Sequence, residues 1–250
     1  MNIRRTACYI SFSVVLVFLG ACAFSPQSAR ANGLPGGVGL GATRVIYHEG
    51  NASATLKIFN TGTSPWLTQV RVTDAAGNNS RAFTAFPPLF RLEGNSENSV
   101  RIRLTGVPGD YPQRTEGVWY IHVLSIPPGS QSAAGGQGRV QGAGGVGVSL
   151  ESVIKLFWRP DGMPEPGSTV FRDVLFTRTP DGVKACNPGK YYLSLNRLKV
   201  DDHSVNLNTA PSMLAPGKCE RYNVRGGKVS WSVINDSGGD SGEFSADISG

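Results

Sequence analysis

The sequence has few of the residues that catalytic and metal sites use. Its 250 residues include only three histidines and four cysteines. His48, His122 and His203 are scattered along the chain, so we interpret them as surface or capping residues and not as metal ligands. No H-E-x-x-H, P-loop or G-x-S-x-G motif occurs. We therefore expect a protein that is not an enzyme and that holds no cofactor and no metal.

Two short patterns resemble enzyme motifs but lack the context that those motifs need. Gly142–Gly147 matches G-x-G-x-x-G, yet a glycine-rich stretch precedes it and strand-like alternation follows it. A dinucleotide fingerprint needs a strand before it and a helix after it. Gly239–Gly242 (GDSG) resembles the nucleophile loop of chymotrypsin-like proteases, but no histidine here has the sequence context of their general base. We interpret the second pattern as a turn, and a secreted hydrolase is the most distant alternative.

Long hydrophobic runs are also absent, apart from one near the N-terminus. Tyr9–Leu19 is apolar and follows Arg4–Arg5, but it is too short to span a bilayer well. This arrangement predicts a signal peptide. Small-residue cleavage sites end at Ala23 and Ala31, and we favour cleavage after Ala31. A lipoprotein signal, which would leave Cys22 acylated, is the alternative.

Strong positive charge is missing once the signal peptide is removed. Loss of Arg4, Arg5 and Arg30 lowers the formal net charge from +6 to +3. No dense stripe of lysine and arginine with interleaved aromatic residues occurs, so nucleic acid is not an expected partner.

Helical periodicity is nearly absent, and short segments with period-two alternation take its place. The 32 glycines and 16 prolines fit many tight turns between these segments. The pattern is typical of all-β sandwiches. The first series comprises Thr43–Tyr47, Ala54–Phe59, Leu67–Val72, Val100–Leu104 and Val118–Ile126. The second series comprises Thr169–Phe176, Tyr191–Val200, Tyr222–Val224 and Val229–Ile234.

A turn-rich and proline-rich link after Pro160 separates the two series. We therefore predict a signal peptide over residues 1–31, a first domain over 32–160 and a second domain over 161–250. Each domain is large enough for a small sandwich core.

The mature chain keeps two cysteines, Cys186 and Cys219, both in the second domain. An even pair in an exported protein is typical of a disulfide, and neither residue belongs to a C-x-x-C pair. In the chain-entropy model this disulfide would stabilise the second domain by roughly 3–4 kcal/mol.

The most informative segment is Val146–Pro160, which reads VGVSLESVIKLFWRP. Val146, Val148 and Leu150 alternate with small or polar residues, so they share one face of an extended strand. Lys155 then interrupts an apolar run. The low-complexity, glycine-rich loop 129–145 precedes the strand, and we expect most of this loop to be disordered. A strand between such a loop and a domain boundary is well placed to pair with another protein.

Seven pieces of the sequence, in this order, resemble the periplasmic chaperones of the chaperone–usher pilus systems. The resemblance covers most of the mature chain, from about Gly39 to Ser241. The pieces are Thr43–Tyr47, Pro88–Leu92, Ile126–Pro128, Ile154–Pro160, Asn187–Pro188 with Tyr191–Tyr192, Met213–Pro216 and Val233–Gly239.

The resemblance implies two immunoglobulin-like sandwiches in a boomerang arrangement. In this family the last strand of the first domain is lent to an incomplete pilus subunit, which is an established case of strand addition. By resemblance Val146, Val148 and Leu150 are the lent side chains. Two cations in a cleft, Arg44 and Lys155, anchor the C-terminal carboxylate of the subunit.

The resemblance also implies an interdomain charge network of Glu116, Arg159 and Asp236. Pilus subunits and an outer-membrane usher are the expected partners, in the periplasm, and the sequence leaves open whether the free protein self-associates weakly through the exposed strand. The alternative from another class is a structural β-sandwich module of a secreted fibre or adhesin.

Two features depart from the family pattern. The loop before the lent strand is about ten residues longer than in short-loop chaperones, which leaves open the choice between short-loop and long-loop subfamilies. Strict alternation also puts Lys155 on the opposite face from Leu150. Both can serve one partner if a local twist or bulge intervenes.

Overall fold

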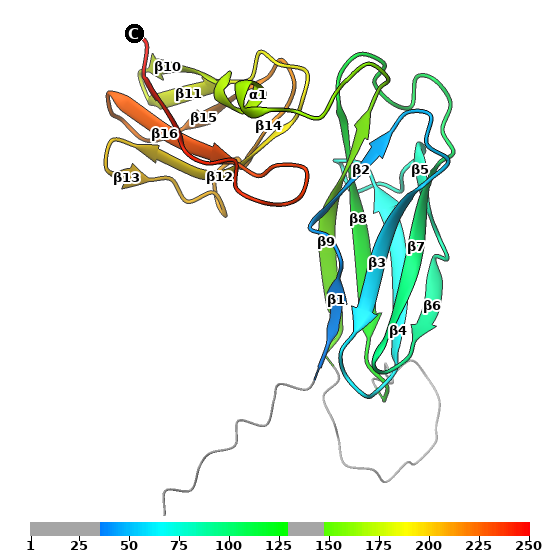
Figure 1. The fold of residues 1–250 in the computed structure, drawn as a ribbon. Helices are drawn as coiled ribbons and strands as arrows, with labels where there is room; N and C mark the ends of the chain where they lie inside the picture. The colour runs from blue at the N-terminus through cyan, green and yellow to red at the C-terminus, as the bar shows by residue number, and fades with distance from the viewer. Residues whose placement is uncertain (1–35, 130–147) are drawn as a thin grey trace, which may run out of the picture. The chain divides into compact units, whose positions relative to one another are not determined.

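The computed structural model describes residues 36–129 and 148–250. The predicted signal peptide with Cys22, most of the predicted loop 129–145, the Gly142–Gly147 pattern and Val146 lie outside the described residues. Almost all regular structure in the described part is β-strand, arranged as two sandwiches (Figure 1). Its single short helix is far from the length and hydrophobicity that crossing a membrane requires.

The first sandwich consists of a four-stranded sheet and a five-stranded sheet. The four-stranded sheet has the order β1-β3-β7-β5, and the five-stranded sheet has the order β2-β9-β8-β4-β6. The strands are β1 (Val38–Leu40), β2 (Arg44–His48), β3 (Ala54–Asn60), β4 (Trp66–Thr73), β5 (Phe83–Phe86), β6 (Leu89–Leu92), β7 (Ser96–Leu104), β8 (Gly117–Ile126) and β9 (Leu150–Arg159).

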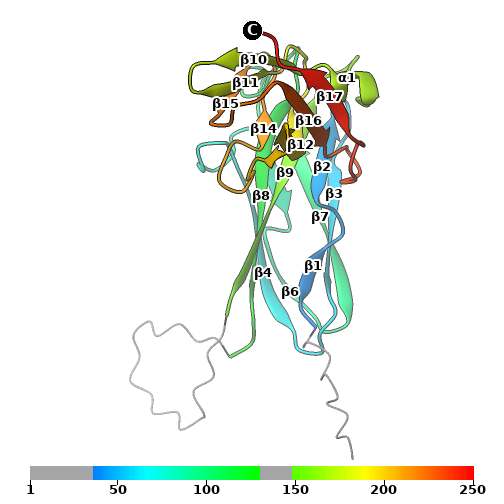
Figure 2. The same cartoon turned by 90° about the vertical axis from the view of Figure 1, so that its left-hand side faces the viewer.

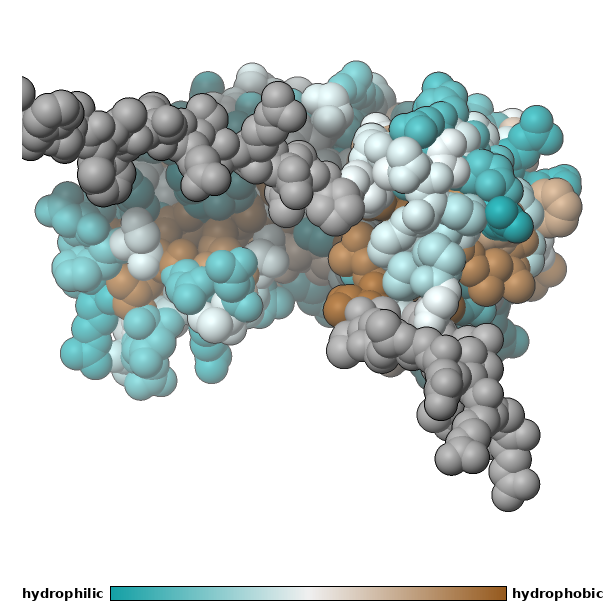
Figure 3. All heavy atoms as spheres, turned by 90° about the horizontal axis from the view of Figure 1, so that it is seen from below, coloured by the Kyte–Doolittle hydropathy of each residue, from teal (hydrophilic) through white to brown (hydrophobic). Residues whose placement is uncertain are grey.

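Alternation in the sequence explains why these segments are strands with one buried face. In β3, Leu56 and Ile58 are fully buried while their neighbours Thr55 and Lys57 are exposed. The buried residues of both sheets meet in one hydrophobic core that includes Trp158. Viewed from below, this sandwich shows apolar patches between hydrophilic ones (Figure 3).

The second sandwich has its own core and a three-stranded sheet of order β10-β11-β15. Its other sheet has the order β13-β12-β16-β17, and β14 also pairs with β12. The elements are α1 (Ser168–Arg172), β10 (Leu175–Thr179), β11 (Gly182–Cys186), β12 (Leu193–Val200), β13 (His203–Ser204), β14 (Met213–Leu214), β15 (Cys219–Tyr222), β16 (Lys228–Val233) and β17 (Phe244–Asp247).

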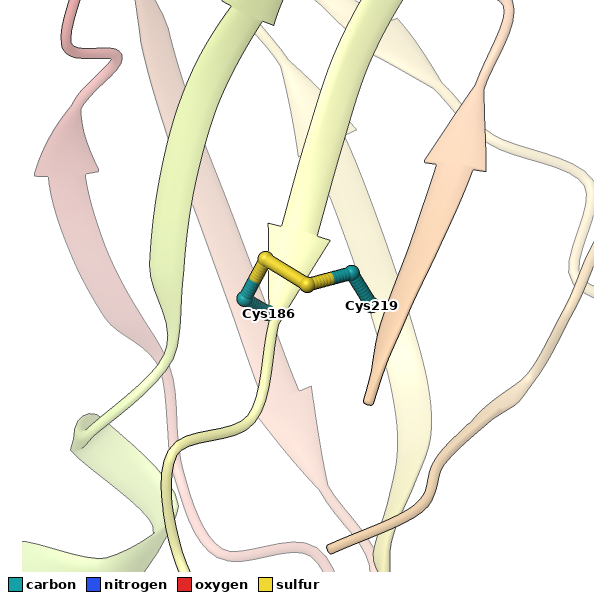
Figure 4. The surroundings of a disulfide bond; sticks show 2 residues. All are labelled: Cys186 and Cys219. Carbon is teal, nitrogen blue, oxygen red and sulfur yellow. A yellow bond between two sulfur atoms is a disulfide. The ribbon is translucent and has the colours of Figure 1, made fainter. Parts of the chain in front are cut away.

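The predicted disulfide is confirmed. Cys186 ends β11 and Cys219 begins β15, and the two residues are directly opposite each other in the ladder between these strands (Figure 4).

One predicted strand is wrong over its first half. Thr169–Phe176 was expected to be extended, but Ser168–Arg172 forms the single helical turn α1 before β10 begins. The core explains the difference, because Phe171 is buried and its carbonyl accepts a 2.9 Å hydrogen bond from the Trp231 indole N–H. Contacts that are distant in sequence thus decide the local conformation.

The GDSG pattern was predicted to be a turn, but the turn lies just before it at Asp236–Ser237, and Asp240 forms an isolated antiparallel bridge with Ile234. The Ser241 hydroxyl donates to the Gly242 carbonyl and accepts from the Val233 N–H. Asp240 pairs with Arg197 at 3.0 Å. Across residues 36–129 and 148–250, no group of three or more histidine, cysteine, aspartate or glutamate residues could hold a metal ion.

Candidate partner-binding site

Strand β9 has two neighbours along one half and only one along the other. β2 runs parallel to its second half, Lys155–Arg159, and β8 pairs antiparallel with Leu150–Trp158. Figure 2 shows β9 between β2 and β8. Within the described residues, no strand pairs with the other edge of Leu150–Ile154. This half of β9 therefore presents unpaired backbone donors and acceptors, which are a template for strand addition.

The ladder between β8 and β9 runs without a bulge. Successive residues pair from Leu150, opposite Ser125, to Trp158, opposite Gly117. The bulge considered for the sequence is therefore absent from this ladder. Lys155 simply occupies the other face of a regular strand from Leu150.

The even-numbered face of β9 passes from the core to exposed surface. Leu156 and Trp158 are fully buried, whereas Leu150 is 45% exposed and Val148, just before the strand, is 72% exposed. Leaving two large apolar side chains in water has a cost that a partner can remove by covering them. On the opposite face Val153 is 50% exposed, and the sequence motif did not single it out.

Arg44 and Lys155 lie side by side on neighbouring strands. They are direct partners in the parallel register between β2 and β9, although more than a hundred residues separate them in sequence. The Arg44 guanidinium lies 5.7 Å from the centre of the Phe157 ring, and its Nη1 donates to the Ile234 carbonyl at 2.9 Å. The Lys155 Nζ donates to the Ser194 hydroxyl at 2.9 Å.

Neither cation has a carboxylate partner among the described residues. The Arg44 Nε is buried, and no group in residues 36–129 or 148–250 forms a hydrogen bond with it. A buried donor without a partner is costly, and an ionised acceptor forms the strongest hydrogen bonds with such donors. The arrangement is therefore suited to a carboxylate.

The electrostatics of the two cations support the same conclusion. Burial, and secondarily the charge of Arg44, lower the pKa of Lys155 from 10.5 to about 8. Burial also lowers the pKa of Arg44, while the charges of Asp236 and Glu116 act in the opposite direction. Both protonated forms are destabilised by desolvation, and a bound anion would offset this.

Arg159 lies between the two acidic residues that the sequence placed in one charge network. It is 1% exposed, and its Nη2 donates to the Glu116 Oε1 and its Nη1 to the Asp236 Oδ2, both at 2.6 Å. The backbone N–H of Tyr192 donates to the other oxygen of Glu116 at 2.8 Å. The Arg159 guanidinium also lies 5.4 Å from the centre of the Tyr191 ring.

Burial affects the two buried members of this network in different ways. Burial alone would lower the pKa of Arg159, but its hydrogen bonds to Asp236 and Glu116 and their charges outweigh burial and raise this pKa. Burial raises the pKa of Glu116, against the hydrogen bond and charge of Arg159. The pair is thus held together in surroundings that would penalise either charge alone.

Sequence reasoning missed the second-sandwich groups that contact Arg44 and Lys155. Ser194 follows the Tyr191–Tyr192 motif, and nothing in its sequence context distinguishes it from other serines. Ile234 contributes its carbonyl, which every residue type possesses. His122, which was interpreted as a surface or capping residue, lies on the outer face of the five-stranded sheet with 17% of its side chain exposed, in a polar cluster across three strands that the sequence did not indicate.

Comparison with known proteins gives one consistent family. Residues 37–164 match a family model described as pili and flagellar-assembly chaperone, PapD N-terminal domain. Residues 169–245 match one described as pili assembly chaperone PapD, C-terminal domain.

Full-length relatives and solved structures agree with the family models. The chaperone protein FocC of Escherichia coli is 33% identical over 207 residues, which cover 81% of this chain and 86% of that protein. The probable fimbrial chaperone protein ElfD of E. coli K12 is 32% identical over 234 residues, covering 92% and 94%.

A chain in the solved complex of the Salmonella enterica SafA pilin with the SafB chaperone has a TM-score of 0.73 and 30% identity. That match covers 84% of this chain and 96% of the other. The E. coli chaperone DraB has a TM-score of 0.72 and 32% identity, with 85% and 98% covered. The chain therefore belongs to the PapD-like pilus-assembly chaperones of the chaperone–usher pathway.

Proposed function

We propose that this chaperone binds pilus subunits in the periplasm by donor-strand complementation and delivers them to an outer-membrane usher. The observation that carries the proposal is the half-open strand β9, which exposes Val148 and Leu150 beside two cations that, in the part of the chain that the structure describes, have no carboxylate partner. The solved SafA–SafB complex, in which a relative binds a pilin, supports the identity of the partner. Membership of the family favours this function over a structural module of a fibre or adhesin.

The exposed face of β9 provides the apolar side chains that an incomplete subunit lacks. In this proposal Val146, Val148 and Leu150 enter the groove of the subunit, and its edge strand pairs with the open edge of β9. Burying each side chain is worth roughly 1.5–3 kcal/mol, and the new backbone hydrogen bonds fix the register. No bond in the partner needs to be broken, so the function requires no catalysis and no cofactor.

The cation pair provides the second element of recognition. Arg44 and Lys155 would bind the C-terminal carboxylate of the subunit, and the free Nε of Arg44 can donate to it. The network of Glu116, Arg159 and Asp236 would hold the domains 32–160 and 161–250 in the arrangement that keeps this site together. These two roles, assigned to five residues, rest on the geometry of the site and on the family resemblance.

Capture of a subunit by a Val148→Asp variant tests the proposal directly. A charge that enters an apolar groove without a partner costs several kcal/mol, so we expect capture of a co-expressed pilus subunit to be lost. The fold should be unaffected because Val148 is 72% exposed.

Val107→Asp is a matched control, because Val107 is 65% exposed and lies outside β9. This variant should capture the subunit as the native chain does. Undiminished capture by a folded Val148→Asp variant would show that β9 is not the binding element.

A further inference from the structure

A cluster of polar side chains crosses three strands on the outer face of the five-stranded sheet. Arg71 on β4 is directly opposite His122 on β8, and Glu151 on β9 is diagonal to His122. All three side chains point away from the sandwich core, on the opposite face from Val148 and Leu150.

The Glu151 carboxylate is the centre of this cluster. Its Oε1 lies 3.0 Å from the His122 Nδ1 and accepts a hydrogen bond from the Arg71 Nη2 at 3.2 Å. The Nε2 of His122 lies 3.0 Å from the Thr73 hydroxyl. A histidine that donates from Nδ1 to Glu151 and accepts at Nε2 from Thr73 satisfies these two contacts, and the 3.2 Å approach of the Arg71 Nη2 to the same Nδ1 is then not a hydrogen bond. Hydrogen bonding by His122 is the main cause that lowers the pKa of Glu151.

The position of Glu151 along β9 gives this cluster a special location. It belongs to the half of β9 that has β8 on one side and, among the described strands, no neighbour on the other. Such an end segment opens easily, because few contacts oppose local fraying. His122 on β8 and Arg71 on β4 hold this segment in place through their contacts with Glu151, the residue next to Leu150.

We propose that Arg71, His122 and Glu151 form a cross-strand tie that pre-orders the open half of β9 for capture of the partner. The three are positioning residues, and they act through the backbone of β9. The tie itself does not depend on the proposed function. Only the event that it would accelerate, capture of a pilus subunit, rests on that function. An exposed ion pair contributes little to global stability, but a comparable change in a local opening equilibrium is readily measured.

Hydrogen exchange of the isolated mature protein tests the tie without any partner. In Glu151→Ala, the segment 150–154 should exchange about three- to tenfold faster than in the native chain, while exchange of β12 stays unchanged. Glu151→Gln, which keeps an acceptor oxygen, should restore part of the protection. His122→Ala should act as Glu151→Ala does, and combining the two should add little, because both remove the same contact.

The exposed ion pair Lys57–Glu97 provides a matched control. It joins β3 to β7 at 3.2 Å in the other sheet of the same sandwich. Glu97→Ala removes an equivalent carboxylate, and it should change neither the exchange of segment 150–154 nor capture of a subunit.

Capture kinetics then connect the tie to function. Association of a pilus subunit with Glu151→Ala should slow by the factor by which the ordered fraction of segment 150–154 falls, which reaches the roughly three- to tenfold change of the opening constant where the open form predominates, with an unchanged melting temperature. Slow association with native exchange would show that Glu151 acts on the partner directly, which overturns the tie. Native exchange together with native association would overturn it as well.

The Val148→Asp variant separates the tie from the proposed function. If that variant loses capture while Glu151→Ala keeps native exchange, donor-strand capture stands and the tie is wrong. If Glu151→Ala exchanges faster while Val148→Asp still captures subunits, the tie exists but serves another event.

Discussion

Replacing Lys155 by methionine should raise the stability of the free chaperone and weaken its binding to a subunit. Methionine keeps much of the aliphatic length but removes a charge that burial destabilises. The change also removes the repulsion between Lys155 and Arg44, which is the second cause of the low pKa of Lys155. The hydrogen bond to the Ser194 hydroxyl is lost in exchange.

The pKa of Lys155 sets the size of the expected change in the free energy of unfolding. Lowering it from 10.5 to about 8 corresponds to at most about 3 kcal/mol at 298 K, and partial exposure of the site reduces this figure. Loss of the hydrogen bond costs roughly 1 kcal/mol. We therefore expect Lys155→Met to raise the free energy of unfolding at pH 7 by about 1–2 kcal/mol.

The pKa shift of Lys155 also determines whether the native chain gains or loses stability as the pH rises. The unfolded chain keeps the proton of Lys155 up to about pH 10.5, whereas the folded chain releases it at about pH 8. The unfolded state thus holds more protons between these values, so the native chain gains stability as pH rises through this window. The advantage of the methionine variant should shrink over the same window.

Urea unfolding of the native chain and of Lys155→Met at pH 7 and pH 10 measures both effects. The difference between the two proteins isolates Lys155 from the tyrosines and lysines that titrate in the same range. A methionine variant that is less stable than the native chain at pH 7 would refute the reasoning. So would a difference in stability that does not change between pH 7 and pH 10.

Three further substitutions test other parts of the molecule. Arg44→Ala should weaken binding of a subunit about ten- to a hundredfold. Calorimetry with a subunit whose C-terminus is amidated should show no difference between this variant and the native chain. Equal affinities of the native chain for free and amidated subunits would reject the carboxylate anchor. Arg159→Ala should lower the free energy of unfolding by about 3–5 kcal/mol, because it leaves Glu116 buried without its partner; a loss under about 1 kcal/mol in urea would contradict this. Replacing Cys186 and Cys219 by serine opens a loop with a sequence separation of 33, so thermal unfolding should show a loss of about 3–4 kcal/mol, and an unchanged melting temperature would speak against it.

Period-two alternation predicted β2, β3, β4, β7 and β8 of the first sandwich, but it did not identify the short strands β1, β5 and β6. Thr43–Tyr47 differs from β2 by one residue at each end, and Val118–Ile126 differs from β8 only at its start. The signal works because each of these strands has one buried face. It failed at α1, where the burial of Phe171 and the indole of Trp231 decide the conformation.

The candidate site was harder to predict than the fold. Resemblance identified Arg44 and Lys155, but their direct pairing depends on the order of β2 and β9 in the sheet, which alternation does not encode. The contacts of Lys155 with Ser194 and of Arg44 with Ile234 depend on the second sandwich. The disulfide needed no such knowledge, because export and the number of mature cysteines left a single pair.

The pairing of Arg44 with Lys155 also has a consequence for how a partner is aligned. That rung is where β2 begins its pairing with β9 and where the open edge of β9 ends. If the last residue of a partner strand is bound at this rung, the register of every other residue of that strand against β9 is fixed by its distance in sequence from that end. Because side chains alternate between faces, adding or deleting one residue at the end of that strand would turn all its other side chains to the wrong face. Selection of partners by the exact length of their final strand would then require no additional contact.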